Sequence, residues 1–212
     1  MVSFYLVRHG EAEASSHGAA LTTLGREQAA ALGARLTDIS FDAVWRSDMV
    51  RAVETAEILA GGRADLAWLV SPALRELDFS SAPPLDAGAE GYRAWEVQAL
   101  VPMAAGLRGW LDRLPAAPAE TPGGGAQGPA LRTSVGVPTH DSRILVVAHS
   151  GPIRLLICQL LGIPVEHHWA FRVDHGSLTV VERGADMGTL VLLNDRCHLA
   201  GIANPAEAHH GR

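Results

Sequence analysis

A chain of 212 residues is long enough to bury one hydrophobic core without disulfide or metal staples, so we expect a single domain over residues 1–212. Its composition, 48% hydrophobic and 19% charged, is typical of a globular protein, and no apolar stretch approaches the roughly 18 residues that cross a bilayer. The formal net charge of −6, without a run of Lys or Arg, argues against nucleic acid as a partner, because binding a phosphate backbone needs clustered cations.

The first half of the chain alternates apolar runs with stretches of helical periodicity. Strands buried on both faces are continuous apolar runs, whereas apolar residues three and four apart indicate helices. The expected elements are a strand at 4–7, a helix from 22 or 23 to 36, a strand at 41–45, a helix from 47 or 48 to 59 and a strand at 66–70. Thr22 or Thr23 would cap the first helix, and Ser47 or Asp48 the second.

A helical insertion is expected over residues 82–114, after an acidic loop at 74–79. Apolar residues recur at helical spacing there, and Pro102 is expected to break the helix. Trp95 and Trp110 share this spacing, which favours the core over a substrate pocket. Residues 115–141 are rich in Pro, Gly, Ala and Thr without periodicity, which predicts a mobile excursion rather than a domain linker.

The last third of the chain contains the strongest predicted strand, 144–148. Its further expected elements are an apolar helix at 153–161 and strands at 169–173, 177–182 and 189–194. Together with the first half, this order predicts an α/β domain.

The start of the chain and its cysteines bear on the compartment. No basic segment precedes an apolar stretch with a cleavage site, so we expect no signal peptide and a cytoplasmic location. Cys158 and Cys197 lack C-x-x-C spacing and have apolar neighbours, which predicts reduced, mostly buried thiols without a disulfide.

Two of the predicted strands end in a histidine. Arg8 and His9 follow the first strand, with Gly10 allowing a ligand close to the backbone, and His149 follows the strongest one. Ligands of open α/β sheets bind beyond the carboxyl ends of the strands, and Arg51, one turn into the second helix, can reach the same edge. A guanidinium grips two phosphoryl oxygens, and a neutral imidazole can attack phosphorus. The tripeptide alone fits equally well a paired arginine and a histidine filling a surface notch.

Five motifs in family order resemble those of the histidine phosphatase superfamily, the phosphoglycerate mutase-like proteins with the Arg-His-Gly signature. They are Leu6-Val7-Arg8-His9-Gly10-Glu11, Leu21-Thr22-x-Leu24-Gly25-x-x-Gln28-Ala29, Ser47-Asp48-x-x-Arg51-Ala52-x-x-Thr55-Ala56, Leu74-Arg75-Glu76-Leu77-Asp78-Phe79 and Val146-Val147-Ala148-His149-Ser150-Gly151-x-Ile153-Arg154. The resemblance implies a three-layer α/β/α fold with a mostly parallel central sheet and a helical insertion over the site. It also implies catalysis without a metal or a cofactor.

The resemblance also implies a role for each matched residue. The residues implied for the phosphate pocket are Arg8, His9, Arg51 and His149, with Ser150 beside them. His9 would be the phosphorylated nucleophile, His149 would assist the reaction, and Glu76 would donate a proton to the leaving oxygen. Asp78, two residues further on and on the same side of an extended segment, is the alternative donor.

The chain also departs from the family pattern. Ala12 and Ser15 stand where Thr and Asn are frequent, so Ser15 or Ser16 would complete the phosphate shell. The segments 80–84 and 122–126 replace motifs that contact substrates in many members, so substrate contacts transfer least well. A metal site is not expected, since the adjacent pair His167-His168, considered together with His175, lacks ligand spacing.

The leading hypothesis is a metal-independent phosphoric monoester hydrolase of the histidine acid phosphatase type, acting on a small phosphorylated metabolite through phospho-His9. Its late segment, Trp169-x-Phe171 with Asp174-His175-Gly176-Ser177-Leu178, resembles the α-ribazole phosphatase or general phosphatase branch more than the mutase branch. A phosphoglycerate-type mutase and a catalytically weak phospho-ligand-binding protein are the alternatives. No membrane partner is expected, and an edge strand near the C-terminus makes a homodimer possible.

Overall fold

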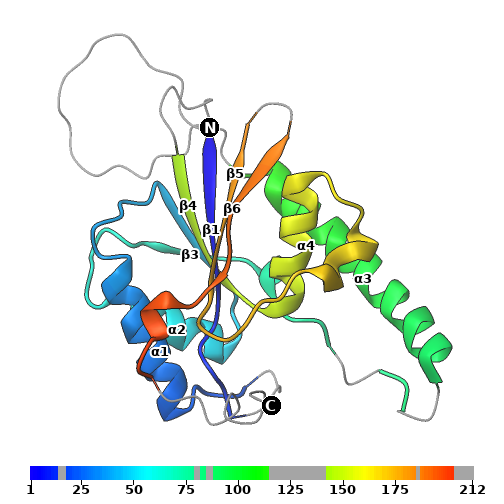
Figure 1. Ribbon diagram of the computed structural model, residues 1–212, viewed down its shortest axis with the longest axis horizontal. Coiled ribbons are helices and arrows are strands. Elements are labelled where there is room, and N and C mark those ends of the chain that lie inside the picture. Colours follow the sequence, from blue (N-terminus) through cyan, green and yellow to red (C-terminus); the bar gives the residue numbers. More distant parts are fainter. Residues whose placement is uncertain (14–17, 79–81, 85–87, 115–141, 185–186, 203–212) are drawn as a thin grey trace.

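A six-stranded mixed sheet lies at the centre of the molecule (Figure 1). The computed structural model describes residues 1–13, 18–78, 82–84, 88–114, 142–184 and 187–202. Its strands are β1 (Val2–Arg8), β2 (Ala43–Arg46), β3 (Trp68–Val70), β4 (Ser142–Ala148), β5 (Leu178–Arg183) and β6 (Gly188–Asp195), in the order β3-β2-β4-β1-β5-β6. The strands β3, β2, β4 and β1 pair in parallel, and β5 pairs antiparallel with both β1 and β6, so that β6 runs in the direction of β1; this confirms the expected mostly parallel sheet.

Helices cover both faces of this sheet. The helices are α1 (Thr23–Arg35), α2 (Val50–Ala60), α3 (Gly88–Asp112) and α4 (Ser150–Leu161), with short 3-10 turns η1 (Pro72–Leu74), η4 (Val165–Ala170) and η5 (Cys197–Leu199). Successive side chains of a strand point to opposite faces, and in β4 Ile144 and Val146 pack with α3 and α4, whereas Leu145 and Val147 pack with α1 and α2. This two-sided burial explains the unbroken apolar run and completes the three-layer α/β/α arrangement.

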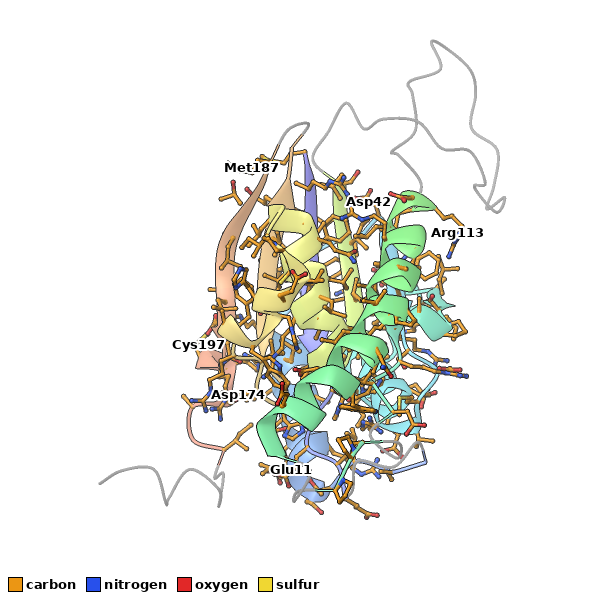
Figure 2. The ribbon with its side chains drawn as sticks, turned by 90° about the vertical axis from the view of Figure 1, so that its right-hand side faces the viewer. Glu11, Asp42, Arg113, Asp174, Met187 and Cys197 are labelled. Carbon is orange, nitrogen blue, oxygen red and sulfur yellow. The ribbon has the colours of Figure 1, made fainter. Side chains whose placement is uncertain are left out.

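The expected insertion is the helix α3, which lies beside α4 (Figure 2). The expected break at Pro102 is wrong, since α3 is continuous through it. Pro102 removes the partner of the Gln98 carbonyl, and both residues are exposed, so water can satisfy that carbonyl. Trp110 is buried as expected and meets Trp45 edge-to-face, with 5.6 Å between ring centroids. The excursion expected over 115–141 lies outside the described residues.

Two expectations for the C-terminal third are wrong. Residues 169–173 form no strand: η4 and irregular backbone occupy this stretch, and β4 and β5 already pair with both sides of β1. Cys197 is exposed rather than buried, because it follows the edge strand β6 and starts η5 at the surface. Cys158, within α4, is buried.

Helix caps and edge strands differ from expectation only in detail. Thr22 caps α1 by accepting a hydrogen bond from the Gly25 amide at 3.0 Å. Met49, not Ser47 or Asp48, is the residue that precedes α2. β6 is one of the two edge strands, the other being β3; its Val191 is exposed, and the homodimer stays a prediction. Within the described part of the chain, no helix has the length and apolar character needed to cross a membrane.

Candidate active site

The register of the two central strands brings the two predicted histidines together. Arg8 lies opposite Ala148 in the parallel pair β1 and β4, so His9 and His149 follow at the same sheet edge. Both side chains are buried, and their ring centroids are 4.9 Å apart. The carboxyl ends of β1 and β4 therefore form the centre of the site.

The imidazole of His9 is oriented by two hydrogen bonds. Its Nδ1 lies 2.6 Å from the Gly10 carbonyl, which only accepts, so Nδ1 carries the proton. Its Nε2 lone pair accepts from the Arg51 Nε at 3.0 Å. Burial, then the neighbouring His149 and Arg8, lower the pKa of His9 well below 6.5. At neutral pH His9 is thus an uncharged imidazole whose Nε2 is a nucleophile beside a guanidinium.

Gly10 is required by a neighbouring backbone rather than by a ligand. A Cβ built on Gly10 would lie 2.2 Å from the Gly25 carbonyl oxygen, and one on Gly25 would lie 2.0 Å from the Glu11 carbonyl oxygen. The Gly10 amide also donates to Thr55 Oγ1 at 3.1 Å. The backbone at the start of α1 therefore packs directly against the segment that follows His9. The sequence had suggested that Gly10 leaves room for a ligand at this position.

Arg8 is held by the segment that precedes β5. Its Nη1 donates to the Val173 carbonyl at 2.6 Å, and its Nη2 donates to His175 Nε2 at 2.7 Å. Burial lowers the pKa of Arg8 to about 10, so the guanidinium stays charged at neutral pH. Burial and the charge of Arg8 lower the pKa of His175 to about 4, consistent with His175 as an acceptor.

Sequence reasoning missed His175 and Ser47 as members of the site. The ring of His175 lies 5.3 Å from that of His9, and Ser47 Oγ lies 3.0 Å from His149 Nε2. Both stand in segments that carry the family resemblance, but individually His175 was weighed as a metal ligand and Ser47 as a helix cap. The signal for Ser47 was its place directly after β2, whose Arg46 lies opposite Val147 of β4. The signal for His175 was its place in the late segment Asp174-His175-Gly176-Ser177-Leu178, since it directly follows no strand of the sheet.

Glu76 lies at the N-terminus of α4. Its Oε2 accepts from Ser150 Oγ at 2.8 Å, and its Oε1 accepts from the amides of Gly151 and Leu77 at 3.0 and 3.1 Å. Three arginines of the site, Arg8, Arg51 and Arg154, feel the charge of Glu76. Burial lowers their pKa values, and the negative charge of Glu76 raises them. The carboxylate therefore faces the same cationic pocket. Asp78, the alternative donor, is exposed.

The remaining expected site residues are placed as follows. Ser15 lies outside the described residues, and Ala12 bridges to Leu21. Among the described residues, no group of three or more His, Cys, Asp or Glu side chains could hold a metal ion. His167 is exposed, and the Nδ1 of the buried His168 lies 3.0 Å from the Val165 carbonyl.

Substituting Gly151 with alanine will displace Glu76, because the new Cβ would lie 2.4 Å from Glu76 Oε1. We expect kcat/KM for phenyl phosphate to fall about 100-fold, the usual cost of a misplacement near 1 Å. The matched control is Gly106→Ala in α3, where a Cβ meets nothing within 4 Å. Steady-state kinetics and thermal unfolding of both variants check the result. Unchanged kcat/KM in Gly151→Ala would contradict a positioned Glu76.

Folding stability will fall as the pH drops below about 6.5. His9 and His175 have lowered pKa values in the folded chain, so between pH 6.5 and the value of about 4 for His175 the unfolded chain binds more protons. The contribution of these two histidines to the free energy of unfolding is therefore complete above pH 6.5 and decreases progressively toward pH 4. Urea unfolding at pH 7.5, 6 and 5 measures this slope, which His175→Gln should reduce. A slope of the opposite sign would refute these pKa directions.

Comparison with known proteins agrees with this geometry. The family model of the histidine phosphatase superfamily (branch 1) matches residues 4–104 and 130–196. The adenosylcobalamin/alpha-ribazole phosphatase of Escherichia coli K12 is 32% identical over 218 aligned positions, which cover 94% of this chain and 98% of that protein. A probable phosphoglycerate mutase of Erwinia tasmaniensis is 30% identical over 191 positions, covering 86% and 85%.

Solved structures give the same result. The alpha-ribazole phosphatase of Shigella flexneri superposes with a TM-score of 0.70 at 28% identity, covering 91% of this chain and 96% of that one. A mycobacterial glucosyl-3-phosphoglycerate phosphatase superposes with a TM-score of 0.69 at 25% identity, covering 91% and 98%. With the shared fold, the Arg-His-Gly segment and the family match over most of its length, the chain belongs to the histidine phosphatase superfamily.

Proposed function

We propose that the protein hydrolyses a small phosphorylated metabolite through a phosphohistidine on His9, without a metal ion. The observation that carries the proposal is the orientation of His9: its Nδ1 proton is held by the Gly10 carbonyl, and its Nε2 lone pair faces Arg51 at 3.0 Å. An uncharged, oriented imidazole among cationic groups fits nucleophilic attack on a phosphoryl group.

In the first step the phosphoryl oxygens bind Arg8 and Arg51, and the phosphoryl group replaces the hydrogen bond between Arg51 and His9. The Nε2 lone pair forms the N–P bond while the P–O bond to the alcohol breaks. Glu76 gives its proton to the leaving oxygen and ends as a carboxylate. His149, next to His9, donates a hydrogen bond to the charge that develops on the phosphoryl oxygens.

In the second step water attacks the phosphorus of phospho-His9 and the N–P bond breaks. The carboxylate of Glu76 takes a proton from that water, which restores both groups and releases inorganic phosphate. Ser150 was expected to bind substrate, and its hydroxyl donates to Glu76 at 2.8 Å, which supports a role in positioning this carboxyl group.

A mutase is the second candidate, supported by the relative named as a probable phosphoglycerate mutase.

The phosphohistidine intermediate is tested by a rapid quench of the reaction with p-nitrophenyl phosphate, which should trap an acid-sensitive, alkali-stable phosphoprotein. We expect this species together with net release of inorganic phosphate. Interconversion of 2- and 3-phosphoglycerate would instead favour the mutase, and tight phosphate binding without phosphoprotein would favour a binding protein. An alpha-ribazole phosphate is the first natural ester to assay, given the names of the relatives.

A further inference from the structure

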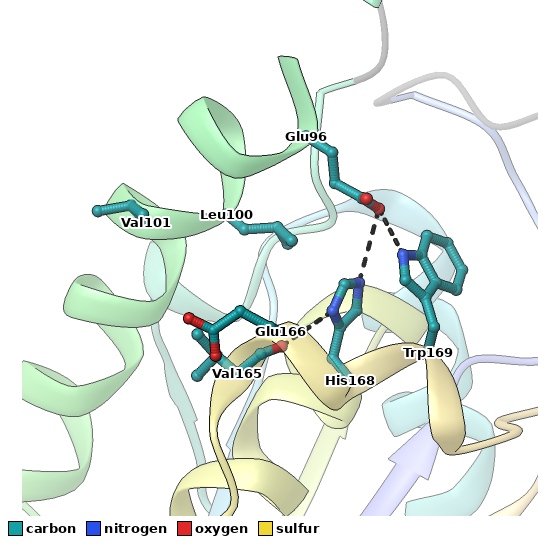
Figure 3. Close-up of a pocket in the computed structure, with 7 residues that line it drawn as sticks. All are labelled: Glu96, Leu100, Val101, Val165, Glu166, His168 and Trp169. Carbon is teal, nitrogen blue, oxygen red and sulfur yellow. Dashed lines mark hydrogen bonds and ion pairs between the residues drawn. The ribbon is translucent and has the colours of Figure 1, made fainter. Parts of the chain in front are cut away.

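A cavity of about 390 Å³ lies between α3 and η4 (Figure 3). Its lining residues are Glu96, Leu100, Val101, Val165, Glu166, His168 and Trp169. This volume is that of a site for a small organic molecule. We call it the leaving-group cavity, and the candidate active site does not use it.

The leaving-group cavity adjoins the predicted proton donor. A small neighbouring cavity, about 30 Å³ in volume, is lined by Glu76, Ser150, Gly151 and Arg154 and shares four residues with the larger one. The shared residues are Glu96, Leu100, His168 and Trp169. An ester whose leaving oxygen lies at Glu76 would therefore extend its alcohol portion toward the leaving-group cavity.

The charge on the walls of this cavity is negative. Glu96 and Glu166 are its carboxylates, and the described residues that line it include no Lys or Arg. Glu96 is largely buried, with a side chain 14% exposed, and accepts a hydrogen bond from Trp169 Nε1 at 2.5 Å (Figure 3). Leucine, valine and tryptophan supply the rest of the wall, so the cavity combines apolar surface with a partly desolvated negative charge.

His168 does not neutralise Glu96 at neutral pH. Its Nδ1 must carry a proton, because Nδ1 faces the Val165 carbonyl at 3.0 Å, and its Nε2 lies 3.7 Å from Glu96. Burial lowers the pKa of His168, so Nε2 is unprotonated at pH 7. The imidazole therefore leaves the charge of Glu96 uncompensated.

Among the described residues, Arg154 is the cation that lines the small cavity beside Glu76. Its Nε donates to the Phe171 carbonyl at 2.8 Å, and its guanidinium carbon lies 4.5 Å above the ring of Trp169. Arg154 lines the small cavity next to Glu76 and is absent from the lining of the larger one. The sign of the electrostatic potential should thus change along the path of the substrate, from positive at the phosphoryl group to negative at the far end.

We propose that the leaving-group cavity binds the alcohol portion of the substrate and selects an apolar group that carries a positive charge over one that carries a second negative charge. The inference rests on the proposed phosphatase function and adds the class of its substrate. Apolar walls bury a hydrocarbon or ring, and Glu96 with Glu166 attract a cation and repel an anion. Phosphoglycerate-like esters, with a carboxylate next to the phosphate, fit this cavity poorly.

Three phenyl phosphates with phenols of similar acidity test the selectivity: 4-(2-aminoethyl)phenyl, 4-ethylphenyl and 4-(carboxymethyl)phenyl phosphate. We expect kcat/KM to decrease in that order. The ratio between the cationic and the anionic ester should be at least about tenfold, because a partly buried carboxylate attracts the ammonium group and repels the second carboxylate. Glu96→Gln should shrink this ratio to a few fold. The matched control is Glu90→Gln, which removes a charge from the first turn of the same helix outside the cavity and should leave the ratio unchanged.

A binding measurement separates this inference from the proposed function. Calorimetry with the free alcohols 4-(2-aminoethyl)phenol and 4-hydroxyphenylacetate should detect the amine more strongly, and Glu96→Gln should remove the preference. Equal kcat/KM for the three esters, or preference for the anion, would overturn the inference and leave the phosphatase intact. Failure of every ester to react, with Glu96-dependent amine binding retained, would overturn the proposed function and keep the cavity's selectivity.

Discussion

The variant His9→Ala will lose turnover of p-nitrophenyl phosphate by a factor on the order of 10⁴ or more, because in the proposed mechanism His9 forms the N–P bond. Two contacts orient His9 for this role: its Nε2 faces Arg51, and its Nδ1 is hydrogen-bonded to the Gly10 carbonyl. Steady-state kinetics and the rapid-quench phosphoprotein assay measure the loss, and both signals should vanish together.

The control for this experiment is His167→Ala, an exposed histidine outside the site. It should keep full activity and its phosphoprotein signal. Retained turnover in His9→Ala would eliminate the mechanism. Loss of phosphoprotein with turnover retained would instead mean direct attack of water on the ester. Circular dichroism and phosphate binding by the variant establish that it folds, since removing a buried imidazole leaves a small cavity.

The second large effect is expected in Glu76→Gln and depends on the leaving group. For phenyl phosphate, whose alcohol needs a proton, kcat/KM should fall by about 10² to 10⁴. For p-nitrophenyl phosphate, whose phenolate leaves without a proton, the loss should stay within about tenfold. The glutamine can keep the local contacts, with its oxygen accepting from the Gly151 and Leu77 amides and its amide group facing Ser150 Oγ.

Asp78→Asn is the matched control because it neutralises the other carboxyl group of the same loop. We expect its kcat/KM to stay near that of the unchanged protein with both esters. If Asp78→Asn shows the dependence on the leaving group and Glu76→Gln does not, Asp78 is the proton donor. Equal losses with both esters in Glu76→Gln would mean that Glu76 shapes the pocket without transferring a proton.

Much of the fold follows from local patterns in the chain. The strand β4 reads as an apolar run because Leu145 and Ile144 face opposite layers of the core, and Thr22 caps α1 where the sequence suggested a cap. The wrong strand at 169–173 shows the limit of such patterns. Alternating apolar residues are compatible with a strand locally. Local periodicity carries no information about which strands are still free to pair, and β1 already pairs on both sides.

For the site, local patterns were enough to find the residues at the ends of the two central strands, since Arg8, His9 and His149 stand where apolar runs end. The contacts between distant segments are visible only in the folded chain: Arg51 donates to the Nε2 of His9, Arg8 donates to His175, and Glu76 accepts from the first turn of α4. The leaving-group cavity is likewise tertiary, because Glu96 and Trp169 lie 73 residues apart and meet through α3 and η4. Strand and helix periodicity extends over a few residues, whereas these hydrogen bonds and charge interactions join segments that are brought together only by packing.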